Sequence, residues 1–93
     1  MIEEAYVSQD IAMRLREKGF REKPGFLPTQ QMAMRWLREE KGIFIEINKT
    51  KDGTYFFSIW EGNIDRGLND VEFETYELAV AFGLLFVLTK FEL

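Results

Sequence analysis

The residue types that most often carry enzymatic chemistry are scarce in this 93-residue sequence. It contains no histidine and no cysteine. Histidine is the usual general base near neutral pH and the commonest metal ligand, while cysteine supplies thiolate nucleophiles and disulfides. Catalysis would have to run on Asp, Glu, Lys, Tyr, Ser or Thr, and the chain has no glycine-rich phosphate loop and no paired-carboxylate motif. We therefore expect no enzymatic activity, no catalytic residue and no bound cofactor.

One acidic segment carries oxygen ligands at a spacing that resembles the calcium-binding loop of an EF-hand. Its candidate ligands stand at positions one, three, five and twelve of that spacing: Glu61, Asn63, Asp65 and Glu72. The sixth position of such a loop must be glycine for its sharp turn, and here it is Arg66. The flanking residues have the pattern of strands, not helices. We interpret the segment as a solvated turn with outward-facing carboxylates and expect no metal site.

Basic residues recur at helical spacing in the first half of the chain. Residues 11–41 hold eight Lys/Arg and four Asp/Glu, although the net charge of the whole chain is −4. We call the following residues the basic strip: Arg14, Lys18, Arg21, Arg35 and Arg38. Such a strip could contact nucleic-acid phosphates. However, the joining segment, residues 20–28, is too long for a helix-turn-helix, and glutamates dilute the charge. Nucleic-acid binding is kept as the alternative function.

Capping residues predict three helices that position these side chains. Serine or threonine hydroxyls precede the helical segments and can accept hydrogen bonds from free amides of the first turn, while glycines end two of them. The predicted helices are one between Ser8 and Gly19, one over residues 30–41 between Thr29 and Gly42, and one over residues 76–90 after Thr75.

Between the second and third helices the apolar period changes to two, which predicts an antiparallel meander of three strands. The predicted strands are residues 43–47, 54–60 and 71–74, with turns at residues 48–53 and 61–69 and a short extra strand at residues 5–7. Helices should cover one sheet face, which gives a two-layer α+β fold in one domain, residues 1–93. The pattern leaves the docking of the first two helices open.

The predicted sheet carries more aromatic rings than one buried face can hold. In the first strand, alternation places Phe44 on one face of the sheet and the isoleucines on the other. In the second strand, it places Phe56 and Trp60 on the face that Phe57 does not share. Whichever face packs on the helices, large rings remain on the other, where a two-layer domain usually has polar residues.

An aromatic outer face has three interpretations. It indicates a protein interface, or a platform on which nucleic-acid bases stack, or a surface covered by the loop of residues 20–28 through Phe26 and Leu27. Base stacking is the weakest of the three, because no basic residue interleaves with these rings in the sequence.

The last predicted helix is apolar on all sides, which indicates burial on all sides. The sheet and a neighbouring helix would cover it, or a second subunit would. Gly83 in its middle costs about 1 kcal/mol relative to alanine, so we expect close packing there. The candidate interface residues are Phe44, Trp60, Leu85 and Leu88.

Three stretches of the chain form a pattern of helix starts and core positions. They are Tyr6-Val7-Ser8 leading through Ala12 and Leu15 to Glu17-Lys18-Gly19-Phe20; Pro28-Thr29-Gln30 with Met32-Ala33 and Trp36-Leu37-Arg38-Glu39; and Tyr76-Glu77-x-Ala79 with Gly83-Leu84. The pattern resembles a group of small uncharacterised proteins encoded by phages and other mobile elements of gut bacteria. The resemblance implies a mobile-element origin and carries over no residue role. Leu78 departs from it, since relatives tend to have an acidic residue there that completes a capping box with Thr75.

These patterns predict a non-enzymatic accessory or protein-interaction protein of a phage or mobile element, which associates with itself as a symmetric homodimer. The first residues, Met1-Ile2-Glu3-Glu4, lack the positive start and apolar run of a signal peptide. The apolar run of residues 78–88 is too short to span a bilayer. We expect a cytoplasmic protein with no membrane partner.

Overall fold

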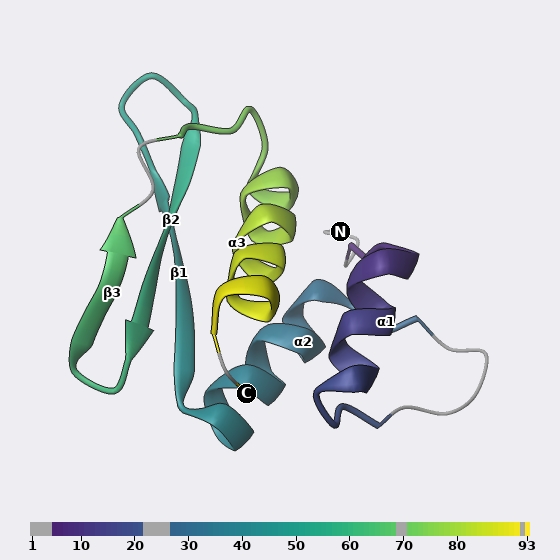
Figure 1. Cartoon of the computed structure of the whole chain (residues 1–93). Helices are drawn as coiled ribbons and strands as arrows, with labels where there is room; N and C mark the ends of the chain where they lie inside the picture. Colours follow the sequence, from purple (N-terminus) through teal and green to yellow (C-terminus); the bar gives the residue numbers. More distant parts are fainter. Residues whose placement is uncertain (1–4, 22–26, 69–70, 92) are drawn as a thin grey trace.

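The computed structural model describes residues 5–21, 27–68, 71–91 and 93. Its elements are α1 (Gln9–Glu17), α2 (Gln30–Trp36), η1 (Leu37–Lys41), β1 (Ile43–Lys49), β2 (Tyr55–Glu61), β3 (Ile64–Leu68) and α3 (Tyr76–Lys90). The strands form one antiparallel sheet in the order β1-β2-β3, and the helices lie on one side of it (Figure 1). The predicted α+β class is therefore confirmed.

The helices begin where the capping residues predicted. Hydroxyl oxygens of Ser8, Thr29 and Thr75 accept hydrogen bonds from the backbone N–H groups of Ile11, Met32 and Leu78 at 3.2, 3.1 and 3.1 Å. The second helix runs to Lys41 as predicted, but its last five residues form the π-helical turn η1. Gly42 closes this turn at φ 68°, a left-handed conformation that glycine adopts without a Cβ penalty.

Backbone contacts before α1 and α2 dock the first two helices. The N–H of Val7 donates to the carbonyl of Pro28 at 3.0 Å, and the N–H of Gln30 donates to that of Ala5 at 2.8 Å. The strand predicted at residues 5–7 is thus a single bridge, between Tyr6 and Thr29. The buried Gln30 side chain donates to the carbonyl of Glu77 at 2.9 Å, which ties α2 to the start of α3.

Helix α3 lies between the sheet and α1 (Figure 1). Ile45 and Phe57 point from the sheet towards Gly83 on α3, where a Cβ atom would lie 3.1 Å from Ile45 Cγ2. The close packing predicted at Gly83 is confirmed. In the part of the chain that the structure describes, no helix is both long and apolar enough to cross a bilayer.

The predicted position of the third strand is wrong. Residues 64–68, predicted as a turn, form β3, which follows a two-residue loop with Gly62 at φ 62°. Within the predicted strand at residues 71–74, Phe73 makes one isolated bridge with Tyr55. The alternation at residues 71–74 reflects the inward packing of Phe73, whose ring stacks on Phe57 with centroids 6.2 Å apart.

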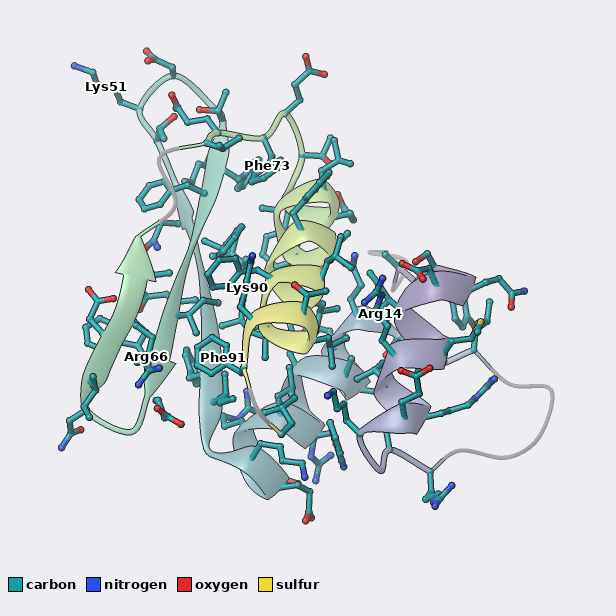
Figure 2. All side chains as sticks on the ribbon, in the orientation of Figure 1. Arg14, Lys51, Arg66, Phe73, Lys90 and Phe91 are labelled. Carbon is teal, nitrogen blue, oxygen red and sulfur yellow. The ribbon has the colours of Figure 1, made fainter. Side chains whose placement is uncertain are left out.

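A series of phenyl rings extends the core between β2 and α3. Neighbouring ring centroids lie 5.0–6.3 Å apart along the series Phe82, Phe73, Phe57, Phe86 and Phe91. Arg66 of β3 closes the end of this series, with its guanidinium carbon 5.3 Å from the Phe91 ring centroid (Figure 2). The series joins Phe57 of β2 to Phe82 and Phe86 of α3 and to Phe91 just after that helix.

Candidate protein interface

The face of the sheet turned away from α3 carries large rings. We call it the outer sheet face, formed by Phe44, Glu46 and Asn48 of β1 and by Phe56, Ser58 and Trp60 of β2. Its location follows from strand alternation, because the neighbouring residues Ile45 and Phe57 point towards α3. The prediction that large rings remain on the sheet face turned away from the helices is confirmed.

Phe44 and Trp60 form an aromatic pair at one end of the outer sheet face, near the start of β1 and the end of β2. They are direct partners in the antiparallel register of β1 and β2, so their side chains lie next to each other. The Phe44 side chain is 42% exposed, which is high for a phenyl ring in a small domain. Trp60 is half-buried, and its Nε1 atom is buried with no hydrogen-bond partner within the described residues.

A positive charge that the sequence did not place lies beside this ring pair. The turn η1 brings Arg38 over the Phe44 ring, with 5.6 Å between the guanidinium carbon and the ring centroid. Such cation–π contacts are typical of arginine. Arg38 therefore belongs to the outer sheet face, where the fold adds a basic residue beside rings that no basic residue interleaves in the sequence.

Small polar groups occupy the middle of the face. The Asn48 Nδ2 atom donates to the Ser58 Oγ atom at 3.3 Å across the two strands, and Ser58 is buried between its larger neighbours. Glu46 is the register partner of Ser58 and is exposed. On β1 and β2 the face thus combines the exposed Phe44 ring and two half-buried rings with the carboxylate of Glu46 and the guanidinium of Arg38, and Asp65 of β3 is the register partner of Trp60. Such a mixture of rings and polar groups suits protein contacts.

The structure does not bring the four predicted interface residues together. Phe44 and Trp60 share the outer sheet face, whereas Leu85 and Leu88 belong to α3 on the other side of the sheet. Leu88 is 4% exposed and is part of the core, so it has no surface to offer a partner. Leu85 is half-buried and lines two hollows beside α3.

Those hollows flank a second apolar surface. Leu78 and Phe82 are 44% and 49% exposed on α3, and Phe82 and Leu85 separate hollows of about 200 and 180 Å³. One hollow faces Phe57 and the other faces α1. The spacing of Leu78, Phe82 and Leu85 by four and three residues was the signal for this stripe in the sequence.

The third interpretation of the aromatic face was that the loop of residues 20–28 covers it. Of this loop, the described residues are 20, 21, 27 and 28. Phe26 lies outside the described residues, and Leu27 packs against the core cluster. Phe20, at the other end, packs edge-on against Trp36 of α2 with centroids 5.4 Å apart.

The basic strip is not one continuous positive surface. Arg14 is paired with Asp10 at 3.2 Å and Arg35 with Glu39 at 3.0 Å, each one helical turn apart. Arg38 lies over Phe44, and the remaining two residues of the strip are Lys18, which is half-buried, and Arg21, which is exposed. Because carboxylates already neutralise two of the guanidinium groups, the strip offers little free charge to phosphates.

We expect no nucleic-acid binding by this strip. Fluorescence anisotropy with single- and double-stranded oligonucleotides, at low salt and micromolar protein, measures it directly. A strip that bound phosphates would give an affinity that falls steeply with added salt. Salt-sensitive binding that is lost in an Arg14→Ala/Lys18→Ala variant would contradict this expectation.

The acidic segment does not converge on a calcium site. Glu61, at the end of β2, is paired with Arg66 at 3.1 Å. Glu72 accepts a hydrogen bond from Thr54, just before the start of β2. The seven residues of β2 separate these carboxylates by about 20 Å. No group of three or more acidic side chains that could hold a metal ion is found among residues 5–21, 27–68, 71–91 and 93.

No protein-family model, no curated protein and no solved structure matches the chain.

Proposed function

We propose that this chain is a non-enzymatic protein-interaction protein that binds its partner through the outer sheet face. The observation that carries the proposal is the exposed Phe44 ring beside Trp60, on the sheet face that a two-layer domain normally makes polar. Exposed aromatic clusters with few charges mark protein interfaces. The accessory role in a phage or mobile element is part of the same proposal and is supported only by the sequence resemblance.

The chemistry of the outer sheet face fits a protein partner better than a small molecule. Ligand sites are concave. The two hollows described above lie beside α3, and a third, of about 210 Å³, lies beside α2 between Trp36 and Glu40. Rings next to Asn48, Ser58 and Glu46 offer apolar contact together with directional hydrogen bonds. The absence of histidine and cysteine from the chain supports a role without catalysis.

Site-specific photo-crosslinking in cells that express the chain tests this proposal. A benzophenone side chain replaces Phe44 in one variant and Met13 in the other. Met13 is a matched control, because it is 57% exposed on α1, away from the sheet. We expect a discrete adduct from position 44 and none from position 13. No adduct at 44, or the same adducts at both positions, contradicts a specific interface on the outer sheet face.

A further inference from the structure

Opposite charges flank the Phe44 ring along β1. Glu46 follows two residues later on the same face, about 7 Å further along the strand. Arg38 comes from η1, which ends just before β1 begins, so its guanidinium approaches Phe44 from the start of the strand. The order along the outer sheet face is therefore positive charge, ring, negative charge.

Neither charge has an opposite charge as its partner among the described residues, and the contact that Arg38 makes is with the Phe44 ring. Both Arg38 and Glu46 are exposed. The other exposed apolar surface differs in this respect. Beside its hollow near α1, Asp10 is already paired with Arg14.

A partner for the outer sheet face must carry the reverse order of charges. A second copy of this chain does so when a two-fold axis crosses the strands at the level of Phe44 and Trp60. That axis reverses the strand direction, so Arg38 of each copy faces Glu46 of the other, while the ring pairs meet at the centre. Two-fold dimers are self-complementary in this way, and sheets commonly pack face to face with aligned strands.

We infer that the partner of the outer sheet face is a second copy of this chain, held by Phe44 and Trp60 at the centre and by two symmetric Arg38–Glu46 ion pairs at the rim. The inference rests on the proposed function and names its partner. Central rings supply most of the affinity of such an interface, and rim charges set its geometry and specificity.

Charge reversal tests the arrangement by analytical ultracentrifugation. We expect a concentration-dependent dimer for the wild type. Each of Arg38→Glu and Glu46→Arg should raise the dimer Kd about tenfold or more, because each creates two like-charge contacts per dimer. The double variant Arg38→Glu/Glu46→Arg restores both pairs in reversed order and should regain most of the affinity.

Two controls separate the ion pairs from other effects. Lys51→Glu changes the net charge as Arg38→Glu does, but lies at the tip of the β1–β2 turn (Figure 2), so it should leave the Kd unchanged. Circular dichroism and melting temperature establish that each variant is folded. If one single variant does not fold, the other and the double variant still decide the outcome.

The possible results distinguish this inference from the proposed function. A wild type that stays monomeric on the order of 0.5 mM, with a position-44 adduct to a different protein, overturns the second copy and leaves the interface in place. A dimer indifferent to both reversals overturns the Arg38–Glu46 arrangement. No adduct at position 44 overturns the proposed function itself. Rescue in the double variant supports the arrangement.

Discussion

Replacing Phe57 with alanine is expected to lower the free energy of unfolding by about 3–5 kcal/mol. Phe57 is 2% exposed and its ring contacts Phe73 and Phe86 at centroid distances of 6.2 and 5.8 Å. It also faces α3 at Gly83. Truncation of the ring would leave a cavity where the sheet, α3 and the series of phenyl rings meet. Small domains have only about 5–15 kcal/mol of stability in total, so the variant should be close to unfolding.

Phe44→Ala is the matched control, because it removes the same ring from the opposite face of the same sheet. We expect a loss of about 1 kcal/mol or less, mostly from the Arg38 contact. Urea titrations at the lowest protein concentration that tryptophan fluorescence permits keep dimerisation from adding to the measured stability. Equal losses in the two variants would mean that the inner and outer faces are wrongly assigned.

Local signals in the sequence were sufficient for the helices and the first hairpin. Ser8, Thr29 and Thr75 satisfy amides within their own first turns, so each helix start is decided by three or four neighbouring residues. The β1–β2 turn likewise closes on itself, with the Thr50 N–H donating to the Thr54 carbonyl at 2.8 Å and Gly53 at φ 87°. Such features do not depend on the rest of the fold.

The third strand shows where local pattern misleads. Residues 64–68 include Asp65, Arg66 and Gly67, which read as a turn, and a bulge leaves Arg66 without a register partner on β2. The strand exists because the Gly62-Asn63 loop returns the chain onto β2. A glycine followed by asparagine between two strand-like segments was the signal that would have found it.

The candidate site was predictable in its rings but not in its charges. Alternation along two strands is enough to place Phe44 and Trp60 on one face. The position of Arg38 depends on η1, whose π-helical hydrogen bonding changes the direction of its side chains relative to an ordinary helix. The burial of Leu88 depends on how the elements around α3 dock, through contacts such as that of Gln30 with Glu77, and no local pattern encodes that docking.

Replacing Gly83 with leucine is expected to lower the free energy of unfolding by about 3 kcal/mol, although leucine is the better helix former. A Cβ atom at this position would lie 3.1 Å from Ile45 Cγ2 and 3.4 Å from Phe57 Cγ. Both neighbours are buried, and Ile45 is β-branched, so its side chain cannot easily turn away. The larger side chain must therefore push α3 away from the sheet.

Alanine at the same position separates helix propensity from packing. Gly83→Ala gains about 1 kcal/mol of helix propensity but needs Ile45 to move by a few tenths of an ångström, so we expect a net change close to zero. In an Ile45→Ala background the crowding methyl group is absent, and Gly83→Ala should then stabilise the protein by about 1 kcal/mol. Urea denaturation of the four chains in this cycle gives the coupling between the two positions. Full stabilisation by Gly83→Ala in the wild-type background, or tolerance of Gly83→Leu, would show that α3 does not lie this close to the sheet.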